Sequence, residues 1–317
     1  MSTLSSVLNR CIKKPDKHIF VLPYNGWFEK SLCKTGHTFY GEVAAASHPW
    51  NPNSFQLPEN FVLLNNRVPP GLEFDFILIN DIYKQIDRAY QISCELHIPI
   101  VNVNHYHPWF FKREDLQKLK NEYRKIYANI AISEDICLGW QSGGEMIGYE
   151  VDMRPTHIKS NTILLLGKYE QKDYYLIKDI CLDFPNLVII GDNPGLSRAG
   201  SIDDENIALD NSKIFLNLST HAEPLTNIYR AMAAGCVVIS NKTPSIENLI
   251  IDGFNGFLAE SVVDFRSTID KVLKNESIAN KIGSNARNTI ETDYSTSAFT
   301  EKWNRVFDFA SRSIFKK

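Results

Sequence analysis

One short segment brings a carboxylate, an imidazole and a helix start together. Residues 219–224 read Ser-Thr-His-Ala-Glu-Pro; they follow an apolar run at 214–218, and a helical pattern then continues to Gly235. Glu223 is therefore expected where a buried strand passes into a helix, with Pro224 at the first helical position. Backbone N–H groups at a helix start lack partners and attract anions such as phosphate. The residues that would offer them here are Leu225, Thr226 and Asn227.

A glycine and two lysines follow another buried run. The apolar residues 164–166 end at Gly167, and Lys168 and Lys172 lie four positions apart at a predicted helix start. Fixed cations of this kind stabilise the negative charge on a leaving phosphate group. The alternative interpretation is two solvated lysines on a loop, since charged side chains are usually exposed.

A third buried run, residues 187–190, ends at Gly191 and Asp192. A glycine directly after a buried strand lets the backbone come close to a ligand. The alternative is a plain turn that ends the strand.

In the first half of the chain, polar and aromatic residues follow two predicted strands. Asn25, Gly26 and Trp27 come after the run 18–23, and a run of histidines and aromatics comes after 98–103. The carboxyl ends of strands in α/β proteins are where ligands bind, so both segments are candidate sites. The members of the second segment are His105, His107 and Trp109. The two histidines lack an evident third ligand, so we expect no metal site.

Residues 215–258 resemble the donor-binding half of retaining GT-B glycosyltransferases, those of glycosyltransferase family 4, or the group 1 type. That family has Glu-x7-Glu followed by Ala-Met-Ala-x-Gly, and residues 230–235 here read Arg-Ala-Met-Ala-Ala-Gly. Residues 244–247 and 252–256 match the next two landmarks. The chain departs from the family at one point: six residues separate Glu223 from Arg230, and the second carboxylate has become an arginine.

The resemblance implies roles for individual residues. Glu223 would fix the hydroxyls of the donor sugar, although a helix N-cap is an alternative role for it. Lys168 and Lys172 would hold the nucleotide diphosphate, and Glu223, Lys172 and His105 are the predicted catalytic residues. The donor would also contact Gly167, Gly191, Asp192, Ser201, Ile202, Leu225, Thr226, Asn227 and Arg230. The acceptor would contact Asn25, Gly26, Trp27, His105, His107 and Trp109.

Arg230 stands where the family has the carboxylate that accepts hydrogen bonds from the ribose hydroxyls. An arginine donates hydrogen bonds and cannot accept them. Arg230 would meet a donor phosphate, pair with an Asp or Glu, or lie exposed. Glu247, in the next landmark, is a candidate for a substitute carboxylate.

The coarse pattern alternates short apolar runs with amphipathic stretches, which favours an α/β fold with parallel sheets. The resemblance implies two Rossmann-like, doubly wound domains in the GT-B arrangement, facing across a cleft. We expect residues 1–154 to bind the acceptor, 155–296 to bind the nucleotide sugar, and 297–317 to form a helix that crosses back onto the first domain. Five residues define the apolar face of that helix: Phe299, Trp303, Val306, Phe307 and Phe309.

The predicted strands and helices of the two halves are bounded as follows. Strands are expected at His18–Pro23, Phe61–Leu64, Phe76–Ile79, Ile98–Val103, Ala128–Ile132, Thr162–Leu166, Leu187–Ile190, Ile214–Leu218 and Cys236–Ser240. Helices are expected at Trp27–Thr35, Ile82–Leu96, Arg113–Tyr127, Asp173–Asp183, Asn227–Ala234, Ser245–Ile251 and Val263–Lys274.

Composition sets further limits. The chain has 317 residues, a net charge of −3 and six cysteines without a CxxC pair. The cysteines are typical of a reduced, cytoplasmic protein, and neither a secretory signal nor an apolar run of membrane-spanning length is visible. The charge gives no general reason to expect nucleic acid or an anionic membrane as partner.

We therefore expect a metal-independent glycosyltransferase (a hexosyltransferase) that moves a sugar from a nucleotide-sugar donor to an acceptor with retention at the anomeric carbon. The donor is a co-substrate, no further cofactor is expected, and UDP-sugars are the commonest donors among the relatives. The acceptor would be a glycan, a lipid-linked molecule or a small molecule. One alternative is the same chemistry on hydroxymethylated DNA bases, because aromatic and basic residues adjoin at 105–125. The other is a catalytically degenerate nucleotide- or sugar-binding protein.

Overall fold

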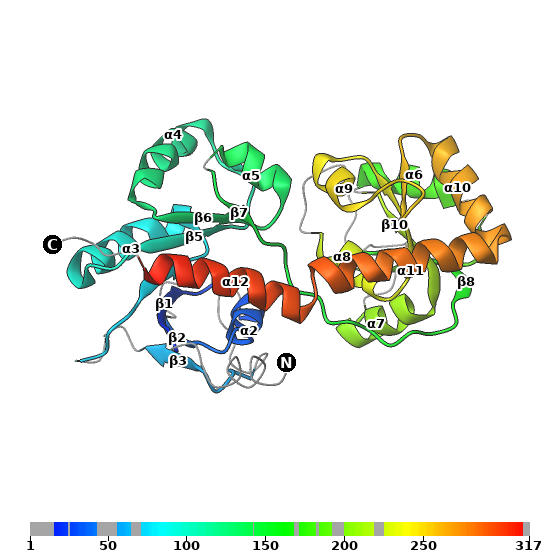
Figure 1. The fold of residues 1–317 in the computed structure, drawn as a ribbon. Helices are drawn as coiled ribbons and strands as arrows, with labels where there is room; N and C mark the ends of the chain where they lie inside the picture. Colours follow the sequence, from blue (N-terminus) through cyan, green and yellow to red (C-terminus); the bar gives the residue numbers. More distant parts are fainter. Residues whose placement is uncertain are drawn as a thin grey trace, which may run out of the picture. The chain divides into compact units, whose positions relative to one another are not determined.

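Short apolar runs of the sequence form the strands of two separate sheets (Figure 1). The computed structural model describes residues 16–24, 26–42, 56–64, 71–141, 143–167, 171–181, 184–191, 200–218 and 225–312; within these it omits the side chains of residues 109, 171–174 and 181. They fall into two compact units. Unit 1 combines residues up to Asn104 with Phe111–Ile130 and the chain from Thr300, and unit 2 combines His105–Phe110 with Ala131–Phe299.

The first sheet has seven strands in the order β3-β2-β1-β4-β5-β6-β7. The strands are β1 (His18–Leu22), β2 (Thr38–Glu42), β3 (Phe61–Leu64), β4 (Phe76–Ile79), β5 (Ile100–Asn104), β6 (Ala128–Ala131) and β7 (Glu145–Met146). The pairs from β3 to β5 are parallel. The helices between them are α2 (Trp27–Cys33), α3 (Ile82–Leu96), α4 (Arg113–Glu122) and α5 (Glu134–Trp140), with 3-10 turns η2 (Pro108–Phe110) and η3 (Tyr123–Lys125).

The second sheet has five strands, all parallel, in the order β12-β11-β10-β8-β9. The strands are β8 (Ser160–Leu166), β9 (Leu187–Ile190), β10 (Ser212–Asn217), β11 (Val237–Asn241) and β12 (Phe257–Ala259). The helices are α6 (Gln171–Cys181), α7 (Ile202–Asn211), α8 (Thr226–Ala233), α9 (Pro244–Leu249), α10 (Val262–Lys274), α11 (Glu276–Asp293) and α12 (Thr296–Ser311).

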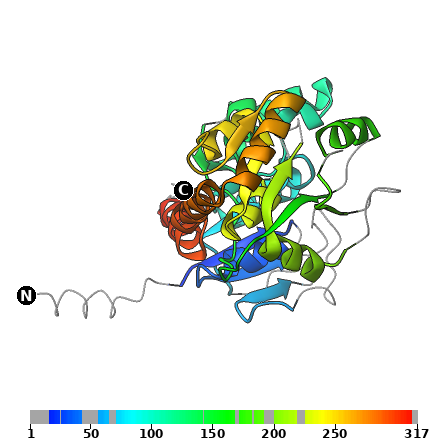
Figure 2. The same cartoon turned by 90° about the vertical axis from the view of Figure 1, so that its right-hand side faces the viewer.

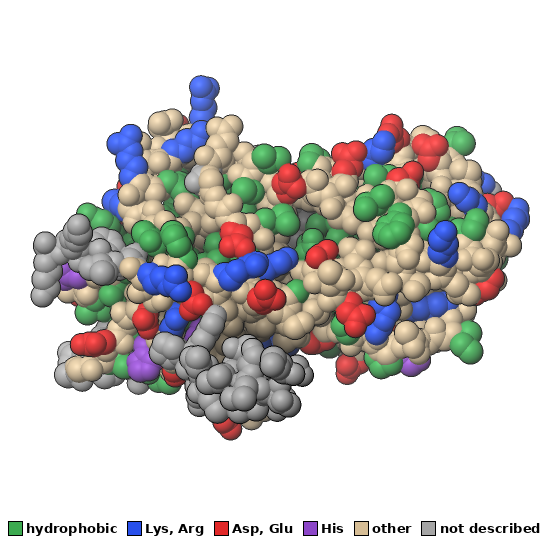
Figure 3. All heavy atoms as spheres, viewed as in Figure 1, with side chains coloured by type: hydrophobic (Ala, Val, Ile, Leu, Met, Phe, Trp, Pro, Cys, Tyr) green, Lys and Arg blue, Asp and Glu red, His purple; other side chains and the backbone are tan. Residues whose placement is uncertain are grey.

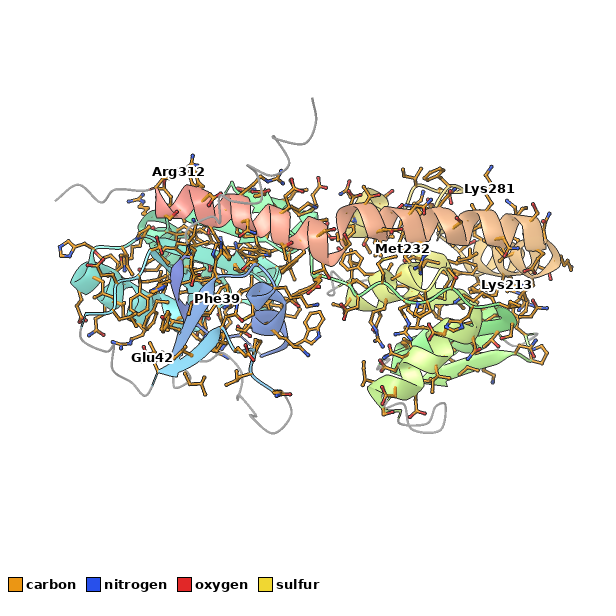
Figure 4. All side chains as sticks on the ribbon, turned by 60° about the horizontal axis from the view of Figure 1, so that its bottom comes forward. Phe39, Glu42, Lys213, Met232, Lys281 and Arg312 are labelled. Carbon is orange, nitrogen blue, oxygen red and sulfur yellow. The ribbon has the colours of Figure 1, made fainter. Side chains whose placement is uncertain are left out.

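Both faces of the five-stranded sheet are covered, which explains why its strands read as continuous apolar runs. Alternate residues of β10 enter opposite layers: Ile214 and Leu216 pack with α6, α10 and the start of α11, while Phe215 packs with α8 and α9. Figure 2 shows α10, in orange, beside the strands of this unit. Met232 of α8 lies in the second layer together with α11 (Figure 4).

Two glycines allow α11 to approach the turn after α8 closely. A Cβ atom on Gly283 would lie 2.3 Å from the carbonyl oxygen of Gly235, a separation that real Cβ atoms essentially never show. Gly235 itself has φ +77°, in the left-handed region that favours glycine. Gly283 is therefore restricted to glycine by packing, whereas Gly235 is favoured as glycine by its backbone conformation.

Helix α12 completes the core of unit 1 from the far end of the chain. Trp303 packs edge-on against Phe28 at 6.0 Å, and Phe307 contacts Phe39 and Phe76. The place of Phe39 under this helix can be followed in Figure 4. This agrees with the predicted return of the terminal helix.

Of the five residues predicted to form the apolar face of that helix, four are buried. Phe299, Trp303, Val306 and Phe307 are buried. Phe309 was assigned to the same face, and that assignment is wrong: its ring is 57 % exposed and stacks on Tyr127 at 5.1 Å. Phe309 follows the buried pair 306–307 by two to three positions, which turns it away from the stripe centred on Trp303 and Phe307.

The predicted bounds of strands agree with the structure better than the predicted bounds of helices. The bounds of β3, β4, β9 and α3 match the sequence prediction to the residue, and most other elements differ at their ends by one to four residues. The helical pattern at 113–127 ends early, since α4 stops at Glu122 and a 3-10 turn follows. Six elements of the structure are not among those predicted from the sequence: α5, α7, α11, β2, β7 and β12.

Candidate functional site

In the five-stranded sheet, the strand order changes direction between β8 and β10. Strand β9 follows β8 on one side, and β11 and β12 follow β10 on the other. Loops leaving the carboxyl ends of the two strands at such a point diverge and leave a crevice, where open α/β sheets bind ligands. The two segments that leave these strands are the ones singled out from the sequence: Gly167 ends β8, and residues 219–224 follow β10.

Gly167 leaves open space at the end of β8. Its φ is +116°, its N–H donates to the carbonyl of Ile190 at 3.0 Å, and a Cβ atom built on it would meet nothing within 4 Å. Gly191, at the end of β9, has φ +149°. Both predicted glycines therefore occupy backbone conformations that side chains rarely adopt, at the edge of the sheet where a ligand is expected.

Polar side chains fasten the carboxyl ends of β10 and β11 to each other. The amide of Asn217 donates to Ser240 Oγ at 2.8 Å, and the amide of Asn241 donates to the carbonyl of Leu218 at 2.7 Å. Ser240 Oγ in turn donates to the carbonyl of Asn241 at 3.0 Å. These bonds fix the point from which the chain leaves for residues 219–224.

Helix α8 begins slightly later than expected. Its first residue is Thr226 and its N-cap is Leu225, which makes no side-chain capping bond. The predicted start at Pro224 therefore moves by two residues, and Leu225 is the residue before the helix. Thr226 and Asn227 are in the first turn, where backbone N–H groups have no acceptor within the helix.

Arg230 is paired with a carboxylate, one of the three alternatives that the sequence left open. Its guanidinium donates to Glu205 Oε2 at 2.7 Å, to Asn227 Oδ1 at 3.1 Å and to Asn206 Oδ1 at 3.1 Å. Because a guanidinium only donates, both amide oxygens must face it, which leaves both amide NH2 groups as donors on the other side. Glu247, the candidate substitute carboxylate, is an exposed residue of α9.

The remaining donor-site predictions are placed as follows. Ser201 is the N-cap of α7: its hydroxyl accepts from the N–H of Asp204 at 3.2 Å. Ile202, the first residue of α7, is 61 % exposed. Lys172 lies in the first turn of α6, with its side chain outside the description. Lys168, Asp192 and Glu223 lie outside the described residues.

The seven-stranded sheet has its own change of direction, between β1 and β4. The loop after β1 is held by Glu29 of α2, whose carboxylate is 1 % exposed. Its two oxygens accept from the N–H groups of Tyr24 at 2.5 Å and Gly26 at 2.6 Å. Gly26 has φ +72° and Trp27 begins α2 with 40 % of its surface exposed, while Asn25 lies outside the described residues.

Two further buried side chains join the ends of β1 and β4. Gln85 donates to the carbonyl of Pro23 at 3.0 Å and accepts from the N–H of Asn80 at 2.8 Å. Asn80 donates to the carbonyl of Leu22 at 3.1 Å. Both side chains are fully buried. Buried polar side chains thus hydrogen-bond the backbone at the carboxyl ends of β1 and β4.

The predicted histidines lie just beyond β5. His105 is 4 % exposed, and its Nδ1 lies 2.7 Å from the hydroxyl of Tyr149. His107 is half-buried against Gly139, since a Cβ atom on that glycine would lie 2.3 Å from His107 Nε2. Burial lowers the pKa of His107 below its usual value. Trp109 belongs to η2, and its side chain is not described.

Within the described part of the chain, no three His, Cys, Asp or Glu side chains lie close enough together to hold a metal ion. The described helices also include none that is long and apolar enough to span a membrane.

Several polar residues with structural contacts in these regions are not predicted from the sequence. Glu29 had a local signal, because Gly26-x-x-Glu29 is the spacing of a capping box. Asn217, Asn241, Gln85, Glu205 and Tyr149 had none, because their partners lie far along the chain and only the strand order brings them together.

Comparisons with known proteins identify chains of similar sequence and fold. The family described as glycosyl transferase-like matches residues 185–304, which include β9 to β12 and α7 to α11. An uncharacterized glycosyltransferase of Methanocaldococcus jannaschii is 22 % identical over 213 residues, which are 63 % of this chain and 52 % of that protein. The matched region thus spans about half the length of this curated relative.

Solved structures share the fold over nearly the whole chain. HepE of Anabaena, solved with UDP and glucose, superposes with a TM-score of 0.74 at 15 % identity, covering 92 % of this chain and 100 % of that one. Sucrose-phosphate synthase of Thermosynechococcus elongatus gives a TM-score of 0.69 at 13 % identity, covering 92 % and 98 %. The fold is that of the GT-B glycosyltransferases, and the resemblance of the sequence to their group 1 type is confirmed.

Proposed function

We propose that this chain is a retaining glycosyltransferase that takes its sugar from a nucleotide donor, with UDP-sugars as the first choice. One observation carries the proposal. The point where the strand order of the second sheet reverses carries Gly167, with φ +116°, and is followed in the chain by residues 219–224; this sheet lies largely within the region matched by a glycosyltransferase family. HepE, with the same fold, was solved with UDP-glucose.

In the proposed reaction the bond between the anomeric carbon and the diphosphate breaks, and the acceptor oxygen bonds to the same face of that carbon. The diphosphate leaves with the bonding electrons and takes the acceptor's proton. Lys168 and Lys172 stabilise the charge that the diphosphate gains. Glu223 fixes the sugar hydroxyls, and the first turn of α8 offers N–H groups to the phosphates. The acceptor is a glycan, a lipid-linked molecule or a small molecule held by residues 25–27 and 105–109.

The carboxylate that Arg230 replaces has a candidate substitute in this proposal. Arg230 holds Glu205, and the two amide groups beside it, from Asn206 and Asn227, are oriented as donors. A carboxylate oxygen next to N–H donors suits a pair of vicinal hydroxyls, as in ribose, which both donate and accept. UDP should then bind more tightly than 2′-deoxy-UDP, and Glu205→Gln should remove that preference.

We further propose that the reaction needs no metal ion and no cofactor besides the donor. Transfer should then continue in the presence of EDTA. A strict requirement for an added divalent cation would contradict this part of the proposal.

The test of the function is a titration with UDP, GDP, ADP and their common sugar conjugates, followed by the melting temperature. One nucleotide should raise it selectively, and its sugar conjugate should raise it further. Glu223→Ala and Lys172→Ala should each abolish transfer with an unchanged melting curve. Lys178→Ala, on the same helix α6, serves as the matched control for Lys172. Normal turnover by both site variants would overturn the site, and nucleotide binding without transfer would favour a degenerate binding protein.

The alternative of a modified DNA acceptor gains no support from the face drawn in Figure 3. On the face drawn in Figure 3, blue and red side chains are interspersed instead of gathered in one basic area. Proteins that bind nucleic acid usually present such an area to the phosphates.

A further inference from the structure

Strand β11 extends one residue beyond its pairing with β10. The last pair between the two strands joins Asn217 to Ser240, whereas β11 continues to Asn241, which pairs with Ala259 of β12. The backbone of Asn241 is therefore held by β12 at a point where β10 has already ended.

The side chain of Asn241 takes over where the pairing with β10 stops. Its amide group donates to the carbonyl of Leu218 at 2.7 Å, and Leu218 is the residue that follows β10. The side chain of Leu218 is 1 % exposed and belongs to the apolar layer that contains Ile214 and Leu216. Leu218 is consequently held twice, by its side chain in that layer and by its carbonyl oxygen through Asn241.

A second pair of hydrogen bonds supports the same junction. The amide of Asn217 donates to Ser240 Oγ at 2.8 Å, and Ser240 Oγ donates to the carbonyl of Asn241 at 3.0 Å. Ser240 is fully buried. Because a hydroxyl group can accept and donate at once, Ser240 joins the last residue of β10 to the last residue of β11.

All of these contacts come from the β11 side of β10. The point where the strand order reverses, and where a ligand is expected, lies on the other side of β10, toward β8. The amide of Asn241 thus holds the carbonyl that precedes residues 219–224 without lying between β8 and β10. Glu223, which is predicted to fix the donor sugar, follows Leu218 by five positions in the sequence.

We propose that Asn241 is a positioning residue for the proposed transfer: by holding the carbonyl of Leu218, it sets the direction in which the chain leaves β10 toward Glu223. The inference rests on the proposed function for the ligand that Glu223 meets. The hydrogen bond from Asn241, and the restraint that it places on the chain, exist in the protein without ligand. Misplacing a catalytic group by about 1 Å can cost roughly a hundredfold in rate, so such a restraint matters although Asn241 does not touch the sugar.

The first test measures backbone hydrogen exchange of the ligand-free protein by mass spectrometry. In Asn241→Ala, peptides that contain residues 218–224 should exchange about tenfold faster than in the wild type, because they lose one restraining hydrogen bond. Asn285→Ala is the matched control: Asn285 is half-buried like Asn241, and its amide donates to the carbonyl of Phe254 at 2.8 Å. The control should leave these peptides unchanged. Equal exchange in the wild type and Asn241→Ala would overturn the proposal.

The second test compares the affinities for UDP and UDP-glucose by calorimetry. Asn241→Ala should weaken UDP-glucose by about tenfold and UDP by less than about twofold, because only the sugar depends on the placement of Glu223. Asn285→Ala loses a comparable hydrogen bond and should leave both affinities unchanged. If Asn241→Ala weakens both ligands by the same factor, or neither, the positioning role is overturned. If the wild type binds neither ligand, the proposed function fails, and the exchange measurement still decides whether Asn241 restrains the chain.

Discussion

The strand order reverses at one point in each sheet, but the residues at the carboxyl ends of the strands differ between the two points. At the ends of β1 and β4, the buried side chains of Glu29, Asn80 and Gln85 hydrogen-bond the loop backbone. Between β8 and β10, Gly167 leaves its surroundings open. Buried polar side chains organise the first edge, whereas at the second edge no described atom lies within 4 Å of where a Cβ on Gly167 would be. We infer that unit 1 presents a preformed loop and that unit 2 contacts its ligand through main-chain atoms.

The largest effect is expected from removing the carboxylate of Glu29, which holds the loop after β1. Glu29→Ala removes the buried carboxylate that accepts from the N–H groups of Tyr24 and Gly26, which should lower the free energy of unfolding by about 3 kcal/mol. Urea denaturation measures it. Lys30→Ala, the next and exposed residue of α2, should change it by less than about 0.5 kcal/mol. Equal stability of the two variants would mean that the loop after β1 does not depend on Glu29.

The second test adds a methyl group at Gly167, at the end of β8. Gly167→Ala should weaken the preferred nucleotide diphosphate by about tenfold, because the added methyl group lies where the ligand approaches the backbone. Gly36→Ala is matched in strain, since Gly36 has φ +84° and also meets nothing within 4 Å. Both variants should lose about 1 kcal/mol of stability, but only the first should lose affinity. Calorimetry that finds equal affinities would remove Gly167 from the site.

The third test compares how the stability of each unit depends on pH. In unit 1 the residue concerned is His37. Burial lowers the pKa of His37, whose Nδ1 accepts from the N–H of Lys17 and whose Nε2 donates to Asn304. Below the ordinary pKa of 6.5 the unfolded chain binds a proton that the folded protein resists, so stability should fall as the pH drops through 6.5. Melting curves from pH 7.5 to 5 should show a shallower loss for His37→Gln. His97→Asn, at an exposed site, should follow the wild type.

The smallest effect is expected from Asp210 of unit 2. Hydrogen bonds from Arg154 lower the pKa of this carboxyl below 3.8. Its contribution is therefore fully present above that value and is lost only as the pH falls through the lower, folded pKa. Asp210→Asn should be less stable than the wild type at pH 7 and should lose less between pH 4 and 2. Parallel curves for the two proteins over that range would contradict this assignment.

How far the sequence predicts this molecule depends on the range of each interaction. The strands β4 and β9 and the helix α3 were predicted to the residue because apolar runs and periodicity are local signals. Gly167 was singled out from its position after a buried run, and its contact with the donor stays a prediction. Helix α11, in contrast, carries Gly283 in its middle, which weakens a helical pattern, and the reason for this glycine is a contact with Gly235.

The partner of Arg230 shows which contacts of the candidate site the sequence could not predict. The sequence alone restricted Arg230 to a phosphate, a carboxylate or solvent, but it could not choose Glu205, which lies 25 residues earlier on another helix. The same holds for Tyr149, 44 residues from His105. Contacts of this kind follow from strand order, and strand order is set by the packing of the whole sheet.

The composition of unit 1 also has a consequence for its synthesis on the ribosome. Its strands are made first, but the rings that cover Phe39 and Phe76 belong to Phe307 and its neighbours in α12. The hydrogen bond between His37 and Asn304 joins residues 267 positions apart. The nascent first sheet must therefore wait, with apolar surface uncovered, while unit 2 is translated and free to fold. The unit that begins the chain is the last to be completed, and chaperones would meet it during that interval.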